Sequence, residues 1–316
     1  MDFQFQNGDK MPSLGLGTWK SDDGQAYYSV KEAIRIGYRH IDCAYRYDNE
    51  KEIGQALTEC IQSGALQRKN LFLTSKLWNN AHFPEDVLPA LERTLSDLRV
   101  NYLDLYLVHW PVAIKPEIGF PSKGGDFVSL QEIPIIETWQ AMEECVARGL
   151  VRHIGVSNFS IKKLDRLLEG GNIKPEVNQI ELHPFLQQKD LVAYCKENGI
   201  LVTAYCPLGS QDRPARLIKE NEPILLNNPV ILEIAGRLGC RPVQVLLKWA
   251  IQRGTSVIPK SANPERLKQN FESQEIALTP SDMESIELLD KHYRYITGEI
   301  WTIDGSPYSQ EELWDE

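Results

Sequence analysis

The chain has 316 residues, of which 42% are hydrophobic and 25% are charged, as is usual for a soluble globular protein. No apolar run approaches the ~20 residues that span a bilayer, and the first residues have neither the basic start nor the apolar stretch of a secretory signal. The lack of a visible signal leads us to expect a cytoplasmic protein. A net charge of -10 argues against general nucleic-acid binding and favours a small-molecule ligand. We also expect a monomer with no nucleic-acid or membrane partner.

The chain opens with a predicted β-hairpin. Apolar and polar residues alternate over residues 3–5, and a second short extended run covers residues 10–12. Between these runs stands Asn7-Gly8, the dipeptide that best supports a type I′ turn.

After the hairpin, short β-rich runs alternate with stretches of helical period. The predicted strands cover residues 14–17, 38–42, 71–76, 103–109, 152–156, 177–180, 200–204 and 256–258, and the predicted helices cover residues 25–36, 49–62, 84–98, 135–148, 160–168, 189–197, 243–251 and 264–271. Repeated strand-then-helix units indicate parallel pairing, and eight of them close a barrel. The predicted fold is an α/β protein, a (β/α)8 TIM barrel with an N-terminal hairpin, forming a single domain over residues 1–316.

Three segments do not fit the repeat. Residues 112–134 are loop-like, residues 207–228 precede an extra predicted helix over residues 229–238, and residues 292–316 form an irregular tail. The loops that follow the strands of such a barrel form its catalytic face, and long loops there are often lids or pocket walls. We therefore expect these long loops and extra helices at the C-terminal face.

Four reactive side chains fall at or just after consecutive predicted strands. Asp42, Lys76 and His109 end three of these strands, and Tyr47 lies in the loop after Asp42. A barrel brings consecutive strand ends together. A phenol with a pKa near ~10 is a poor proton donor, and a nearby ammonium lowers that pKa. We expect Lys76 to assist Tyr47 as the proton donor, Asp42 to keep Lys76 charged, and His109 to hydrogen-bond a substrate carbonyl.

Each of these residues also has an ordinary structural explanation. Asp42 would cap a turn, Tyr47 would be an aromatic residue in a loop, and Lys76 would be a surface charge. His109 would be a histidine whose ring nitrogens form structural hydrogen bonds. Their joint placement at adjacent strand ends favours function, because surface solvation would scatter them over the helices and the opposite face.

A metal-dependent barrel hydrolase is an alternative enzyme class. Its candidate ligands are His40, Asp42, His109 and His183. The sequence has no H-x-H pair and no suitable bridging lysine for such a site, so we expect no metal.

Eight short motifs extend over most of the chain. They are GLGTW at residues 15–19, HIDCA at 40–44 leading through Tyr47 to NE at 49–50, LTSKLW at 73–78, DLYLVHWP at 104–111, IGVSNF at 154–159, NQIELHP at 178–184, AYCPLG at 204–209 and IPKS at 258–261. In these motifs and their order the chain resembles the aldo-keto reductases. The resemblance implies NADPH-dependent reduction of aldehydes or ketones, aldoses included, to alcohols, with Asp42, Tyr47, Lys76 and His109 as the catalytic residues and Tyr47 as the general acid.

No G-x-G-x-x-G motif follows a strand, so a Rossmann domain is not expected. The resemblance instead places the nicotinamide of NADPH or NADP+ in the barrel mouth. Tyr205 would stack on its ring, and Ser157, Asn158 and Gln179 would hydrogen-bond its carboxamide. The alternative for Ser157 and Asn158 is to cap the following helix.

A second group of residues resembles the family's pocket for the adenosine 2′-phosphate. Lys260, Ser261 and Arg266 combine two cations, a hydroxyl and a helix N-terminus, which suits a phosphate dianion, although such cations are more often solvated surface charges. The remaining expected cofactor contacts are Gly17, Thr18, Trp19 and Cys206, Gln269 and Asn270 for the adenine, and Leu208 and Ser210 over the pyrophosphate with Asp212 anchoring that loop.

Large aromatic residues accompany these motifs. Trp19, Trp78 and Trp110 stand beside catalytic or cofactor motifs, and Phe120 and Trp301 lie on two of the irregular segments. Aromatics in loops more often pack than bind, but several at one rim form the apolar wall of a small-ligand site. With His109 they predict a substrate pocket for aromatic, aliphatic or sugar aldehydes.

A non-catalytic NADPH-binding sensor or partner subunit on the same fold is the alternative function. The complete catalytic set argues for turnover, and Tyr47 is the residue that discriminates between the two functions. Aldehyde-dependent oxidation of NADPH separates them experimentally.

Overall fold

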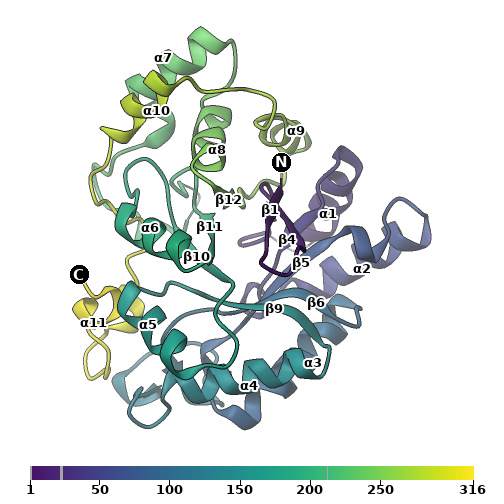
Figure 1. The fold of residues 1–316 in the computed structure, drawn as a ribbon, viewed down its shortest axis with the longest axis vertical. Helices are drawn as coiled ribbons and strands as arrows, with labels where there is room; N and C mark the ends of the chain where they lie inside the picture. Colours follow the sequence, from purple (N-terminus) through teal and green to yellow (C-terminus); the bar gives the residue numbers. More distant parts are fainter. Residues whose placement is uncertain (1, 22–23, 212) are drawn as a thin grey trace.

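The computed structural model describes residues 2–21, 24–211 and 213–316. Within them, eight parallel strands form one sheet in chain order, surrounded by helices (Figure 1). The strands are β3 (Leu16–Gly17), β4 (His40–Asp42), β5 (Phe72–Leu77), β6 (Leu103–Val108), β9 (Val151–Ser157), β10 (Val177–Glu181), β11 (Leu201–Tyr205) and β12 (Thr255–Val257).

The first and last parts of this sheet meet and close it into a barrel. Parallel bridges join Leu14 to Val257 and Gly17 to Lys260. A Cβ atom on Gly17 would lie 2.6 Å from the carbonyl oxygen of Ile258, so only glycine permits this approach. The predicted (β/α)8 barrel is confirmed.

The helices that follow the strands form the outer layer (Figure 1). They are α1 (Gln25–Ile36), α2 (Glu50–Gln62), α3 (Pro84–Leu98), α4 (Ile135–Ala147), α5 (Ile161–Gly170), α6 (Lys189–Glu197), α8 (Pro242–Gln252) and α9 (Pro264–Glu272). Each predicted strand and helix begins and ends within two residues of an observed element. Proline at the first position of α3, α8 and α9 marks their starts, because its fixed φ suits a helical residue whose N–H has no partner in the helix.

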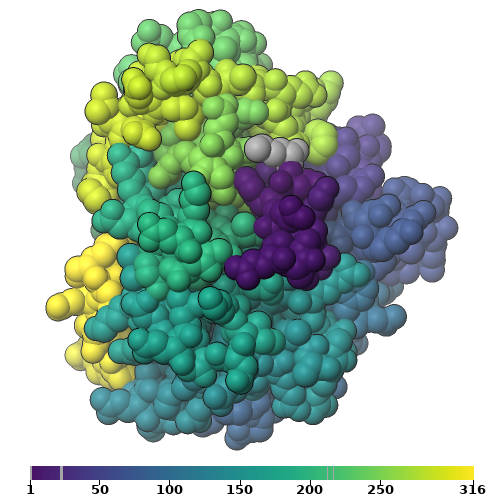
Figure 2. Space-filling model, viewed as in Figure 1, coloured from purple at the N-terminus to yellow at the C-terminus, as the bar shows by residue number. Residues whose placement is uncertain are grey.

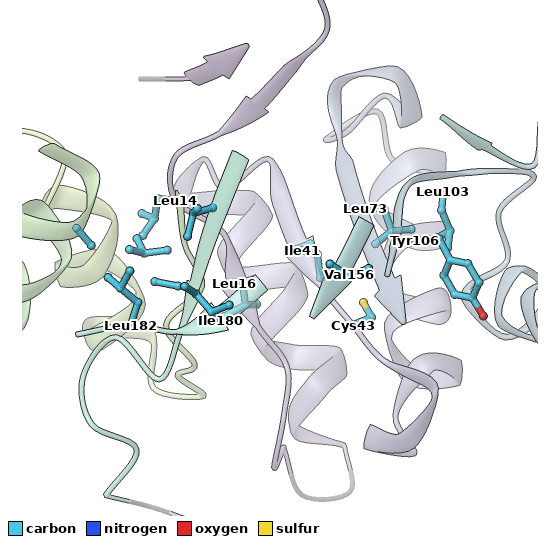
Figure 3. Close-up of a cluster of buried hydrophobic side chains, with 14 of the residues drawn as sticks. Leu14, Leu16, Ile41, Cys43, Leu73, Leu103, Tyr106, Val156, Ile180 and Leu182 are labelled. Atoms are coloured by element: carbon cyan, nitrogen blue, oxygen red, sulfur yellow. The ribbon is translucent and has the colours of Figure 1, made fainter. Parts of the chain in front are cut away.

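The alternation of side chains along β5 separates the core from the site. Leu73 points outward into the apolar layer between sheet and helices, part of which Figure 3 shows, and Ser75 points outward to Glu50 on α2. Thr74 and Lys76 point into the barrel, where Thr74 bonds His40 and Lys76 bonds Asp42. The two-residue period of a strand thus places Lys76 inside the barrel at its C-terminal end.

The predicted N-terminal hairpin is confirmed, with β1 (Asp2–Gln4) antiparallel to β2 (Lys10–Pro12). Phe5 and Met11 pack against residues at the start of barrel strands and close the N-terminal end, and the hairpin lies across the face shown in Figure 2. The predicted type I′ turn is wrong. Gly8 has a positive φ of 95° but Asn7 does not, and a type I′ turn needs both, so the wider loop closes with Gly8 N–H donating to Phe5 O.

Residues 112–134 contain more regular structure than expected. β7 (Ala113–Ile114) pairs with β8 (Phe127–Val128) in an antiparallel ribbon. The hydroxyl of Tyr308 accepts from Ala113 N–H at 2.9 Å and donates to Val128 O at 2.6 Å, so the tail fastens this ribbon.

The extra helix α7 (Pro229–Leu238) has the predicted bounds, but α10 (Pro280–Glu287) and α11 (Gln310–Trp314) were not predicted. Both follow a capping box, Thr279 with Asp282 and Ser309 with Glu312, which is a usable sequence signal. Figure 1 shows α11 beside α5, where Lys163 donates to carbonyl oxygens of the α11 end. Among the helices of the described residues, none is both long enough and apolar enough to cross a membrane.

Candidate active site

A cavity of about 1770 Å³ opens at the C-terminal ends of the barrel strands. The predicted site residues that line it are Gly17, Thr18, Trp19, Asp42, Tyr47, Trp78, His109, Trp110, Phe120, Ser157, Asn158, Gln179, Tyr205, Cys206, Leu208, Ser210, Lys260, Ser261, Arg266, Gln269, Asn270 and Trp301. Lys76 lies buried behind the cavity wall, and Asp212 falls outside the described residues.

Lys76 is the centre of the buried polar group beneath this cavity. Its Nζ donates to Asp42 Oδ1 at 2.5 Å, to Cys43 O at 2.9 Å and to Tyr47 Oη at 3.3 Å. Gln179 Nε2 donates to the other oxygen of Asp42 at 2.7 Å. All three donors of the ammonium are therefore used, and both oxygens of the carboxylate have partners, as a buried charge pair requires.

A short turn after β4 brings Tyr47 to Lys76. Two residues separate the end of β4 from the 3-10 turn η1 (Tyr45–Tyr47), which closes at Asp48, whose φ of 58° is left-handed. The turn reverses the chain over the barrel end, so the Tyr47 hydroxyl reaches the ammonium from the cavity side.

The pKa of Tyr47 shifts in the opposite direction to that expected. Burial raises it to about 12, while the charge of Lys76 acts against this rise. As predicted, the charge of Lys76 acts to lower the pKa of Tyr47. The predicted net decrease of this pKa is wrong, because desolvation raises it by more and Asp42 offsets part of the positive charge of Lys76. Tyr47 therefore holds its proton at neutral pH.

Lys76 keeps its charge despite its burial. Desolvation acts to lower its pKa, but Asp42 and Tyr47 outweigh it and raise the pKa to about 12. The ammonium next to the Tyr47 hydroxyl can stabilise negative charge that develops there.

His109 faces the same part of the cavity as a neutral imidazole. Burial, with a contribution from Lys76, holds its pKa well below the usual range. Its ring lies 5.8 Å from that of Tyr47 and 5.2 Å from that of Trp78, edge-on to both. Nδ1 is buried and has no hydrogen-bond partner within the described residues. A neutral imidazole can donate one hydrogen bond to a carbonyl oxygen.

The residues expected around a nicotinamide form one connected amide network. Asn158 Nδ2 donates to His109 O at 3.0 Å, Tyr205 Oη donates to Asn158 Oδ1 at 2.6 Å, and Ser157 Oγ donates to Gln179 O at 2.8 Å. The alternative that Ser157 and Asn158 cap α5 is wrong, because Ser160 is its N-cap. The network connects the amide side of the cavity to the catalytic group.

Basic residues gather at the far part of the cavity, at the start of α9. Lys260 and Ser261 precede the helix, and its N-cap Asn263 accepts from Arg266 N–H at 3.0 Å. The Arg266 guanidinium is exposed and has no ion-pair partner in the part of the chain that the structure describes. Arg241 also lines the cavity but is not among the predicted residues, because nothing in the sequence places the start of α8 near that of α9.

The predicted aromatic wall forms near His109. Trp78 stacks with Phe120 at 6.4 Å between ring centroids and packs against Trp301 at 5.7 Å, and Trp110 packs against Trp301 at 5.5 Å. Trp301 is only 2% exposed, so it supports the wall as much as it lines it. Trp19 also lines the cavity, with the Lys20 ammonium 4.0 Å from its ring centroid.

Glu181 fastens the C-terminal tail across the cavity and is not among the predicted site residues. Its carboxylate accepts from Tyr295 N–H at 2.6 Å, from Ile296 N–H at 2.8 Å and from His183 Nε2 at 2.9 Å. The sequence could have indicated Glu181, because this acidic residue directly follows a predicted strand, in the same motif as Gln179. These contacts fix residues 295–301 along the cavity.

The ligands of the metal-hydrolase alternative do not come together. His40 bonds Thr74, His183 bonds Glu181, and Asp42 bonds Lys76. Within residues 2–21, 24–211 and 213–316, no three histidine, cysteine or acidic side chains are grouped as metal ligands.

Comparison with known proteins agrees with this geometry. The Aldo/keto reductase family model matches residues 13–291. The chain is 54% identical over 314 residues to Aldo/keto reductase slr0942 of Synechocystis sp. (strain ATCC 27184 / PCC 6803 / Kazusa), covering 99% of this chain and 96% of the relative. It is 48% and 47% identical over 300 residues to Aldo-keto reductase family 1 member A1 of Mus musculus and Homo sapiens, covering 94% of this chain and 91% of each relative. The chain belongs to the aldo/keto reductase family and is an oxidoreductase.

Proposed function

We propose that this protein reduces the carbonyl group of aldehydes or ketones, aldoses included, to the alcohol with NADPH as hydride donor and Tyr47 as general acid. The observation that carries this proposal is the position of Lys76 Nζ, 2.5 Å from Asp42 and 3.3 Å from the Tyr47 hydroxyl, at the base of the cavity. A neutral phenol can donate its proton to the alkoxide that forms during reduction. A charged lysine beside it favours this transfer, because the ammonium stabilises the phenolate that is left.

In this mechanism the residues of the chain orient the carbonyl and supply its proton. NADPH, when bound, supplies the hydride to the carbonyl carbon, since no side chain can do so. His109 donates a hydrogen bond to the carbonyl oxygen and holds it near Tyr47. Tyr47 transfers its proton to that oxygen, Lys76 stabilises the phenolate that remains, and solvent restores the proton. Asp42 keeps the ammonium charged and in place.

The direct test is oxidation of NADPH with a panel of neutral aldehydes, with the alcohol identified and formed in a 1:1 ratio to NADP+. Tight NADPH binding without any oxidation would instead support the sensor or partner-subunit alternative. The complete Asp42, Lys76 and Tyr47 contact set favours turnover.

The basic end of the cavity leads us to expect a preference for NADPH over NADH. Arg266, which is unpaired among the described residues, and Lys260 suit the 2′-phosphate, whereas NADH offers neutral hydroxyls there. Replacing Arg266 with Ala is expected to weaken NADPH binding roughly tenfold or more and to leave NADH binding nearly unchanged. Fluorescence titration with both cofactors measures this.

Lys268→Ala is the matched control for Arg266→Ala. Lys268 stands on the same helix, pairs with Glu272 at 3.7 Å and does not line the cavity. Equal kcat/KM with the two cofactors in the wild-type protein, or unaltered NADPH affinity in Arg266→Ala, would contradict the assignment.

The pH dependence of reduction should report the pKa of Tyr47. A general acid is active while protonated, so activity is present below its pKa and is lost above it. Because burial raises the pKa of Tyr47 to about 12, kcat/KM for a neutral aldehyde should be flat through neutral pH and fall only on the alkaline side. A fall centred near pH 7 would show that another group supplies the proton.

A further inference from the structure

Arg46 is a cation on the wall of the aromatic part of the cavity. It is the middle residue of η1 and directly precedes Tyr47. Its side chain is 34% exposed, and its guanidinium carbon lies 5.5 Å from the centroid of the Phe120 ring. A charged group here is unexpected for a pocket that otherwise offers tryptophan and phenylalanine to a substrate.

The hydrogen-bonding capacity of Arg46 is only partly used. Nη1 donates to Asp48 Oδ2 at 2.5 Å, and the Asp48 side chain is 70% exposed. Nε is buried and has no hydrogen-bond partner among the described residues. A guanidinium has five N–H donors in a planar fork that matches a carboxylate or a phosphate. Arg46 therefore retains donors for a second anion.

The aromatic wall connects Arg46 to the reacting end of the cavity. Phe120, on which the guanidinium lies, stacks with Trp78 at an interplanar angle of 12°, and Trp78 packs edge-on against His109. A substrate whose carbonyl lies between Tyr47 and His109 can thus extend along this wall toward Arg46. Because the net charge of -10 repels anions at long range, an anionic substrate needs such a local cation.

We propose that Arg46 is a specificity-determining residue that binds an anionic group at the end of the substrate remote from the carbonyl, so that aldehydes or ketones carrying a carboxylate or a phosphate are preferred. The inference rests on the proposed reductase function. Carboxylate and phosphate share the chemistry that a guanidinium recognises, and the experiment below separates them.

The test compares kcat/KM for pairs of aldehydes of equal length, one neutral and one ending in a carboxylate or a phosphate. The measured quantity is the ratio of kcat/KM for the anionic aldehyde to kcat/KM for the neutral aldehyde of the same pair. In Arg46→Met this ratio should fall roughly tenfold or more, since a hydrogen-bonded charge pair is lost. Arg46→Lys should give an intermediate ratio, because it keeps the charge and loses the fork.

Asp48→Asn should raise the ratio, because it removes the carboxylate that occupies one arm of Arg46. Asparagine tolerates the left-handed φ of 58° at this position, so the turn is expected to persist. Arg148→Gln is the control for net charge, since Arg148 is the C-cap residue of α4, pairs with Glu144 and does not line the cavity. It should leave the ratio at the wild-type value.

A series of ω-carboxylate aldehydes of increasing chain length distinguishes anion binding by Arg46 from a purely structural role of this residue, which would not make the ratio depend on chain length. Binding to one fixed cation predicts a maximum of the ratio at one length, and loss of that maximum in Arg46→Met. A ratio that is the same in Arg46→Met and the wild-type protein, or that falls equally in Arg148→Gln, overturns the inference. Absence of turnover with every neutral aldehyde would overturn the proposed function itself, which is a separate result.

Discussion

Replacing Tyr47 with Phe is expected to lower kcat for carbonyl reduction by about 10²–10⁴-fold and to leave NADPH binding nearly unchanged. The substitution removes the hydroxyl that lies 3.3 Å from Lys76 and keeps the ring that packs edge-on to His109. Lys76 retains Asp42 and Cys43 O as acceptors, so the buried charge pair persists. The loss should therefore fall on proton transfer.

Tyr45→Phe provides the matched control, because Tyr45 belongs to the same turn but does not line the cavity. It should keep the wild-type kcat. The comparison needs conditions under which chemistry limits the rate, which a primary isotope effect with deuterated NADPH establishes. Wild-type kcat in Tyr47→Phe under those conditions would eliminate Tyr47 as the proton donor.

Replacing Lys76 with Met should have the second large effect, on both stability and turnover. The side chains of Lys76 and Asp42 are 0% and 2% exposed, so the substitution leaves a buried carboxylate without its counter-charge. Breaking such a pair costs about 3–5 kcal/mol of the free energy of unfolding, which corresponds to a fall in Tm on the order of 10 °C. Turnover should also fall by at least about 10²-fold, since the phenolate of Tyr47 loses its stabilising charge.

A double variant separates these two effects. In Lys76→Met with Asp42→Asn, neither position carries an uncompensated charge, so Tm should recover toward the wild-type value while turnover stays low. Thermal unfolding and kcat at a temperature where both variants are folded measure this. Recovery of turnover together with Tm would mean that Lys76 acts through stability alone.

The sequence by itself determined the barrel and the part of it that carries the chemistry. The alternation of short β-rich runs with stretches of helical period located the strands and helices within two residues, because each buries one face in the layer that contains Leu73 and Tyr106. Asp42, Lys76 and His109 were found because they stand at strand ends, which a parallel barrel must bring together. The single-domain organisation, the monomeric state and the cytoplasmic location stay predictions.

The tertiary structure decided what depends on distances between segments far apart in the chain. The net pKa of Tyr47 results from desolvation by its surroundings against the charge of Lys76, and no local pattern gives that balance. The position of the tail depends on Glu181, 114 residues before Tyr295 in the chain. The orientation of Arg46 toward Phe120 arises only where η1 meets the 112–134 segment. Local periodicity reports which face of an element is buried, whereas these contacts are fixed by how the loops pack once the barrel has closed.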